Sequence, residues 1–156
     1  MAARRYLEEF GEQIARNGYE VIPIRPGEKR PFGESWQKYD GSPEGVQEWI
    51  EAGKGSFGVG IKCRTSPAID IDVHDKAVVD EIAEMISART GETLRRVGKP
   101  PKMLLTYRTN EPFAKVDSGF WVDDKGRTVK VEILADGQQY VAAHVHPDTG
   151  LSLIHI

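Results

Sequence analysis

Two segments of the sequence alternate apolar and charged side chains strictly, and this alternation constrains the fold more than any other feature. Residues 68–73 read Ala-Ile-Asp-Ile-Asp-Val, in which the alternation begins at Ile69, and residues 129–133 read Val-Lys-Val-Glu-Ile. Successive side chains of a β-strand point to opposite faces of the sheet. Both segments are therefore predicted to be strands that bury one face in a core and display acidic side chains on the other.

The acidic side chains of these strands are candidate metal ligands. Asp70 and Asp72 stand on one face of their strand, ~7 Å apart, and like charges this close are costly unless a cation or a proton compensates. Mg²⁺ and Mn²⁺ prefer carboxylate oxygens and keep positions open for substrate phosphates. We therefore expect Asp70 and Asp72 to be catalytic, with Glu132 as a third ligand in a site for two ions. The alternatives are an exposed acidic strand, and for Glu132 a surface ion pair with Lys130.

The remaining patterns mix helices and strands and predict an α+β fold, a single domain over residues 1–156. The segment Asp136-Gly137 lies between the last two expected strands and predicts a tight β-hairpin. Glycines at alternate positions of residues 57–63 predict a bare strand face that something approaches closely. Residues 110–124 have no clear assignment. Helices are expected at residues 4–17, 42–53 and 75–91, and strands at residues 19–24, 57–63, 68–73, 103–108, 129–134 and 139–145.

Composition and charge limit the function classes. The chain is 39% hydrophobic and 29% charged, with a net charge of -3, so it is not a uniformly basic protein that coats nucleic acid, and any contact with DNA is expected to be local. No stretch approaches ~20 apolar residues, so no membrane partner is expected. The single Cys63 cannot form an internal disulfide, which favours a reducing cytoplasm. Residues 151–156 are expected to be non-native or unstructured, at a truncation of the chain.

Basic residues in two loops are candidates for nucleotide or phosphate contacts. Lys29 and Arg30 lie in a loop bounded by glycine and proline, and Lys102 ends the basic turn of residues 95–102. An ammonium group binds phosphate as a point charge. The alternative interpretation for these residues, and for Lys99, is that they are solvated loop charges.

Histidine and tryptophan side chains supply weaker candidates. His146 is expected to line a triphosphate pocket, and His144 is close enough in sequence to form a metal-binding pair with it. The alternative is that both are polar turn residues. Trp36 lies in a polar loop and is a candidate for stacking on a base, whereas Trp49 fits the core stripe of a helix.

The order of these motifs resembles the N-terminal domain of bifunctional DNA primase-polymerases, a family of the archaeo-eukaryotic primase superfamily common on phages and plasmids. The resemblance is carried by residues 19–31, Trp36-Gln37, residues 58–61 and 68–73, and by residues 131–141 followed by the His-Pro-Asp-Thr-Gly turn at 146–150.

The resemblance implies an N-terminal αβ module packed on a mostly antiparallel catalytic sheet related to the RNA-recognition-motif fold. It also implies template-directed nucleotidyl transfer with two Mg²⁺ or Mn²⁺ ions on Asp70, Asp72 and Glu132. The implied partners are a DNA template or primer, nucleoside triphosphates and a fused or associated helicase, in a bacterial or phage-infected cell.

The sequence departs from the family at one motif. The family has a Ser-x-His motif before the strand at 103–108, whereas residues 98–102 here read Gly-Lys-Pro-Pro-Lys. Lys102 is expected to replace that histidine as a phosphate contact. A metal-dependent nuclease and a non-catalytic nucleotide- or DNA-binding module of replication remain the alternative functions.

Overall fold

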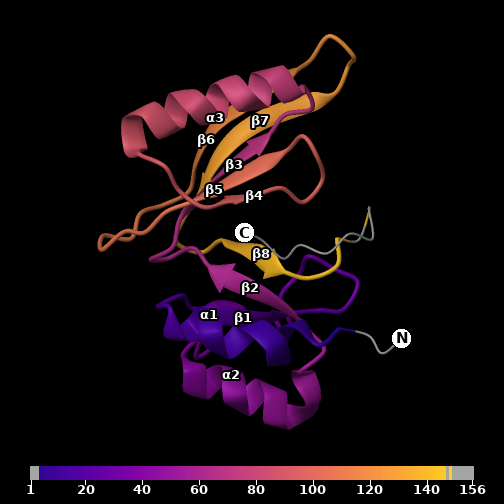
Figure 1. Cartoon of the computed structure of the whole chain (residues 1–156), viewed down its shortest axis with the longest axis vertical. Coiled ribbons are helices and arrows are strands. Elements are labelled where there is room, and N and C mark those ends of the chain that lie inside the picture. The colour runs from indigo at the N-terminus through magenta and orange to yellow at the C-terminus, as the bar shows by residue number, and fades with distance from the viewer. Residues whose placement is uncertain (1–3, 147, 149–156) are drawn as a thin grey trace.

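Two antiparallel β-sheets form the framework of the molecule (Figure 1). The computed structural model describes residues 4–146 and residue 148. The smaller sheet has the strand order β1-β2-β8 and the larger one β4-β5-β3-β7-β6. The expected α+β class, with mostly antiparallel strands, is confirmed. The strands of the smaller sheet are β1 (Val21–Ile24), β2 (Gly58–Lys62) and β8 (Gln139–Ala143).

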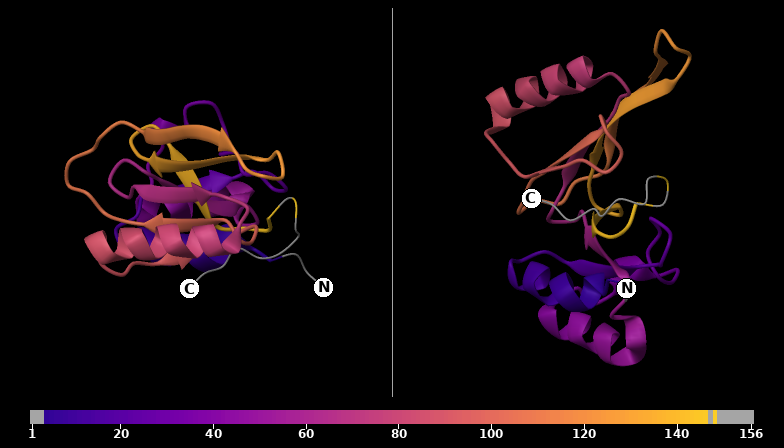
Figure 2. Two further views of the ribbon diagram at one scale, coloured as in Figure 1. Left: turned by 90° about the horizontal axis from the view of Figure 1, so that it is seen from above. Right: turned by 45° about the vertical axis from the view of Figure 1, so that its right-hand side comes forward.

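The larger sheet carries the two alternating segments on adjacent strands. Helix α3 (Lys76–Thr90) covers one face of this sheet, and buried Ile71, Leu105 and Val129 form the core beneath it (Figure 1). The opposite face is turned toward the smaller sheet (Figure 2). The strands are β3 (Ala68–Asp72), β4 (Arg95–Arg96), β5 (Met103–Thr106), β6 (Val116–Val122) and β7 (Thr128–Leu134).

An N-terminal module consists of the smaller sheet and the helices packed on it. Its core contains Leu7, Val46 and Val59, all fully buried. The module matches the αβ unit that the resemblance implied. Its helical segments are a π-helical turn η1 (Leu7–Gly11), α1 (Glu12–Arg16), a 3₁₀ turn η2 (Trp36–Lys38), α2 (Pro43–Trp49) and a second π-helical turn η3 (Ile50–Lys54).

The prediction of a β-hairpin around Asp136-Gly137 is wrong. Strand β7 pairs with β3 and strand β8 pairs with β2, so the two neighbours in sequence belong to different sheets. The turn itself forms, with Gln138 N–H donating to Ala135 O at 2.9 Å and Gly137 at φ +86°. The turn therefore carries the chain from one sheet to the other, because β2 lacks a partner on that side and β8 supplies it.

The glycines of β2 allow close packing within the protein. A Cβ atom on Gly58 would lie 2.6 Å from His144 Cγ, and one on Gly60 would lie 2.5 Å from Ile24 Cδ1. The close approach expected from the sequence is therefore made by the protein's own side chains. Among the residues that the structure describes, no helix is long and apolar enough to cross a membrane.

Asp75 caps α3, and its removal is expected to weaken the fold. Its Oδ1 accepts hydrogen bonds from the N–H groups of Ala77, at 2.9 Å, and Val78, at 3.3 Å. We expect Asp75→Ala to lower the free energy of unfolding by about 1 kcal/mol in urea titrations. Glu84→Ala, an exposed change on the same helix, should alter it by less than about 0.5 kcal/mol, and an equal loss in both variants would contradict the capping role.

Candidate active site

Strand register brings the three candidate carboxylates to one face of the larger sheet. Asp70 is the direct partner of Glu132, and Asp72 is the partner of Lys130. Side chains directly opposite each other on antiparallel strands have Cβ atoms about 5 Å apart. Helix α3 does not cover this face. Ile71 lies between the two aspartates in sequence, Val131 lies between Lys130 and Glu132, and both point to the α3 core on the opposite face.

A polar cavity of about 130 Å³ lies against this face, between the two sheets. Asp70 and Asp72 line it from β3, while Lys29 from the loop after β1 and His146 from beyond β8 close it from the N-terminal module. Four basic side chains and two acidic ones line the cavity, so it carries an excess of positive charge. The basic residues are Lys29, Arg96, Lys99 and Lys102.

Two of the three carboxylates, Asp72 and Glu132, form ion pairs with lysines. Lys102 Nζ lies 2.6 Å from Asp72 Oδ1. Glu132 is buried, and its Oε1 lies 2.6 Å from Lys115 Nζ and 2.9 Å from Lys130 Nζ. Burial alone raises the pKa of Glu132, but the hydrogen bonds from the two lysines outweigh it and lower that pKa. Glu132 therefore stays ionised although it is shielded from water.

Asp70 is the carboxylate with the least compensation. Burial raises its pKa above the ordinary value, and the charges of Asp72 and Glu132 raise it further, against the opposing charges of Arg96 and Lys102. A cation that reached Asp70 would relieve this repulsion.

The raised pKa of Asp70 predicts a stability that falls with pH. The folded protein holds the Asp70 proton more tightly than the unfolded chain does. The contribution of Asp70 to stability therefore declines as the pH rises from 3.8, the ordinary pKa of this carboxyl, to the higher pKa of the folded state, and it is constant above that pH. Asp70→Asn should therefore raise the melting temperature at pH 7 without metal, and this gain should vanish below about pH 4. A variant that melts lower than the wild type at pH 7 would refute the idea.

The polar cavity supplies some of the oxygen ligands that a hard divalent cation needs, but not all three of the expected carboxylates. Asp70 and Asp72 offer carboxylate oxygens to it, and Mg²⁺ and Mn²⁺ favour such ligands. Glu132 does not line the cavity. Within residues 4–146 and 148, no three His, Cys, Asp or Glu side chains are arranged to hold an ion. A site that used Glu132 would require its lysine partners to move.

The basic and histidine candidates are separated by the fold. Lys29, Lys102 and His146 line the cavity, whereas Arg30 lies outside it, with Nε 3.6 Å from Glu28 Oε2. Burial lowers the pKa of His146, and the nearby charge of Lys29 lowers it further, so this imidazole is neutral at pH 7. The turn at 147 and 149–150 lies outside the described residues.

The N-terminal module contains the other candidate histidine, His144, and two of the three tryptophans, Trp36 and Trp49. The His144 ring stacks edge-on against Tyr6, and its Nε2 lies 3.0 Å from Arg25 O. His144 is therefore not part of the cavity that His146 lines. Trp36 packs against the core of β1 and β8, and Trp49 packs, as expected, against the core cluster that contains Leu7 and Val46.

Sequence reasoning missed Arg96. This arginine lies on the edge strand β4 and pairs with Leu104 of β5, which in turn pairs with Asp70 of β3. Its side chain lines the polar cavity together with the two aspartates. Its Nε has no hydrogen-bond partner among the described residues. The basic run at 95–102 marked the segment, but a two-residue edge strand has too few residues to show which arginine faces the cavity.

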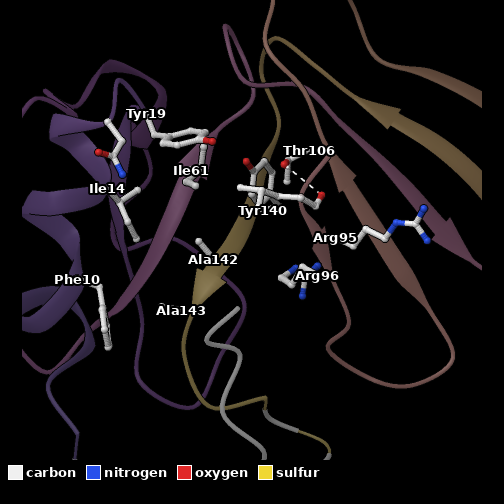
Figure 3. A pocket seen from close by; sticks show the side chains of 12 residues that line it. Phe10, Ile14, Tyr19, Ile61, Arg95, Arg96, Thr106, Tyr140, Ala142 and Ala143 are labelled. Carbon is white, nitrogen blue, oxygen red and sulfur yellow. Dashed lines mark hydrogen bonds between the residues drawn. The ribbon is translucent and has the colours of Figure 1, made fainter. Parts of the chain in front are cut away.

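Arg96 also borders a second cavity, of about 300 Å³, at the boundary between the N-terminal module and β4 (Figure 3). This cavity is largely apolar. The buried hydroxyl of Tyr140 has no hydrogen-bond partner in the described part of the chain, and burial raises its pKa. This second cavity is larger than the polar cavity, but no carboxylate lines it. Figure 3 shows Phe10, Ile14 and Tyr19 on one side and Arg95, Arg96 and Thr106 on the other.

Comparison with known proteins identifies the family. The sequence profile of the bifunctional DNA primase/polymerase N-terminal domain matches residues 12–150. The chain belongs to this family. The match spans both sheets and every strand of the structure, and it confirms the resemblance drawn from the motifs. No curated protein matches the sequence. Membership implies primase or polymerase activity and the binding of DNA and nucleotides.

Proposed function

We propose that the chain is a template-directed nucleotidyltransferase whose reaction takes place at the polar cavity beside Asp70 and Asp72. One observation carries this proposal: two aspartates line a small cavity together with four basic side chains. A nucleoside triphosphate bound with divalent cations has the complementary arrangement, because its phosphates attract the basic groups and its cations attract the carboxylates.

The basic side chains would hold and orient the triphosphate. Lys29 and Lys99 reach the cavity from loops, and Lys102 reaches it from the turn before β5. Burial lowers the pKa of Lys29, and the charges of Arg96 and Lys102 lower it further. Such mutual repulsion among cations is relieved when an anion binds between them. Lys102 thus takes the role proposed for the family's histidine, as a point charge on phosphate.

The carboxylates would hold Mg²⁺ or Mn²⁺. Asp70 and Asp72 are the proposed ligands, with Glu132 joining them after Lys115 and Lys130 turn toward phosphate. When bound, such ions lower the pKa of the attacking 3′-hydroxyl and offset the charge of the leaving pyrophosphate. Lys102 now pairs with Asp72, so the same residue would change from carboxylate partner to phosphate contact on substrate binding.

Cation binding can be measured without activity. We expect Mn²⁺ at about 100 times its dissociation constant to raise the free energy of unfolding by about 2.7 kcal/mol. The variant Asp70→Asn with Asp72→Asn should show no such rise, since its amides lack the charge of the carboxylates. Equal stabilisation of the wild type and this variant would exclude Asp70 and Asp72 as ligands.

The decisive assay separates synthesis from cleavage. The protein is incubated with a primed DNA template, Mn²⁺ and labelled nucleoside triphosphates, and the products are resolved by length. Extension of the primer is the expected result. Shortening of the DNA would favour a metal-dependent nuclease, because the same carboxylates can activate water. Nucleotide binding without incorporation under any divalent ion would favour a non-catalytic module.

A further inference from the structure

Exposed apolar side chains gather along the edge strand β6. Monomeric proteins rarely leave such side chains clustered on the surface without a role in binding. Every residue of β6 is exposed, and its outer edge has no strand partner among the described residues. Phe120 is the extreme case, with 74% of its surface exposed. The exposed large apolar residues of this segment are Phe113, Val116, Phe120, Trp121 and Val122.

Strand register places Phe120 on the face that carries the carboxylates. Phe120 pairs with Lys130 on β7, and Lys130 pairs with Asp72 on β3. Neighbouring strands are about 4.8 Å apart, so the backbone of Phe120 lies about 10 Å from that of Asp72. Trp121 pairs with Val129, which belongs to the α3 core, so it points to the opposite face.

A β-bulge sets this orientation. Asp117 pairs with Glu132 and Phe120 pairs with Lys130, so three residues of β6 advance where β7 advances two. Gly119 adopts φ +70° within the bulge. In a regular ladder Gly119 would have been the partner of Lys130, and Phe120 would have pointed to the α3 face. Bulges commonly re-aim a side chain beside a functional site, and here the bulge brings an aromatic ring to the carboxylate face.

Two lysines accompany the aromatic ring: Lys130 is the strand partner of both Phe120 and Asp72, and Lys115 precedes β6. Lys115 and Lys130 both contact Glu132, and each ammonium-bearing side chain remains about one-third exposed, at 35% and 38%. An exposed aromatic ring flanked by cations on a sheet face suits single-stranded nucleic acid, because bases stack on the ring and the cations attract backbone phosphates.

We propose that Phe120 is a stacking platform for a base of the primer strand close to its 3′ end. This inference rests on the proposed function, which requires the 3′-hydroxyl to reach Asp70 and Asp72. Stacked bases along one strand are about 3.4 Å apart, so a separation of about 10 Å places the contact within about three nucleotides of the terminus. Phe120 is thus a positioning residue that holds the primer end beside the carboxylates.

Adjacent aromatic residues on opposite faces give a matched test. Fluorescence anisotropy would measure the affinity of a recessed primer–template duplex for the wild type, Phe120→Ala, Phe120→Trp and Trp121→Ala. We expect Phe120→Ala to weaken binding about tenfold, whereas Phe120→Trp retains affinity and Trp121→Ala changes it less than about twofold. Circular dichroism checks folding, which an exposed substitution should leave intact.

A second measurement identifies the strand that stacks. 2-Aminopurine is placed either in the last three primer positions or opposite them in the template, and its fluorescence is recorded on binding. Quenching that depends on Phe120 is expected at the primer positions. Quenching confined to the template positions would overturn the assignment to the primer.

Other results would also overturn the proposal. Equal losses in Phe120→Ala and Trp121→Ala would mean that no specific stacking occurs on the carboxylate face. If Phe120→Ala leaves DNA affinity unchanged but halves the mass measured by sedimentation, the edge of β6 instead joins two copies of the chain. Binding does not require incorporation, so a Phe120-dependent affinity without synthesis would refute the proposed function alone, and synthesis with no Phe120 effect would refute this inference alone.

Discussion

Replacement of Asp70 and Asp72 together by alanine is expected to reduce nucleotide incorporation roughly a thousandfold or more while the protein stays folded. Both carboxylates line the cavity between the sheets, and neither belongs to the apolar core on the other face of β3. Their removal opens no apolar cavity, and it eliminates Asp70, whose pKa is raised by burial and by the charges of Asp72 and Glu132. Labelled primer extension measures the rate, and circular dichroism measures the fold.

The control for this variant carries the same change in charge. Glu81 and Glu84 are exposed on α3, which covers the opposite face of the sheet. We expect Glu81→Ala with Glu84→Ala to retain incorporation within about twofold, since exposed charges far from a site are largely screened. Incorporation by the aspartate variant at a rate similar to this control would remove the polar cavity from consideration as the active site.

Replacement of Ile71 by alanine is expected to lower the free energy of unfolding by about 3 kcal/mol. Ile71 is fully buried beneath α3, between the two aspartates in sequence and on the opposite face of the strand. Truncation removes buried methyl and methylene groups and leaves a cavity that a central strand cannot close. Urea unfolding measures the loss, and a decrease in the melting temperature of about 10 °C should accompany it.

Two further substitutions separate burial from strand propensity. Ile71→Val should cost about 1 kcal/mol, because it removes one methylene group and preserves the β-branch. Val122→Ala, at a position that is 61% exposed on β6, should change stability by less than about 0.5 kcal/mol. A loss at Ile71 no larger than at Val122 would mean that β3 is not the central, buried strand of its sheet.

Local pattern was sufficient for the elements that hold the site. The alternation at 68–73 predicted β3, and the alternation at 129–133 predicted β7, each with its apolar face in the core. The capped helix at 75–91 and the family were also predicted correctly. These features depend on residues a few positions apart, and such spacing is read directly from the sequence.

Pairing between distant strands was beyond the local pattern. The sequence predicted a hairpin at Asp136-Gly137, but a turn signal does not specify whether the following strand stays in the same sheet. Strand β8 joins the smaller sheet because it pairs with the free edge of β2, a strand more than seventy residues earlier in the chain. The same limit hid β6, whose alternation is broken by its bulge.

The sequence by itself determined that Asp70 and Asp72 share one face of a strand and that Glu132 stands on one face of another. Only the tertiary structure decided that Asp70 and Glu132 are direct partners, that Arg96 and Lys29 reach the same cavity, and that Arg30 does not. The physical reason is that side-chain alternation follows from the backbone geometry of a single strand. Contacts between strands depend instead on the burial and hydrogen bonding of segments far apart in the chain.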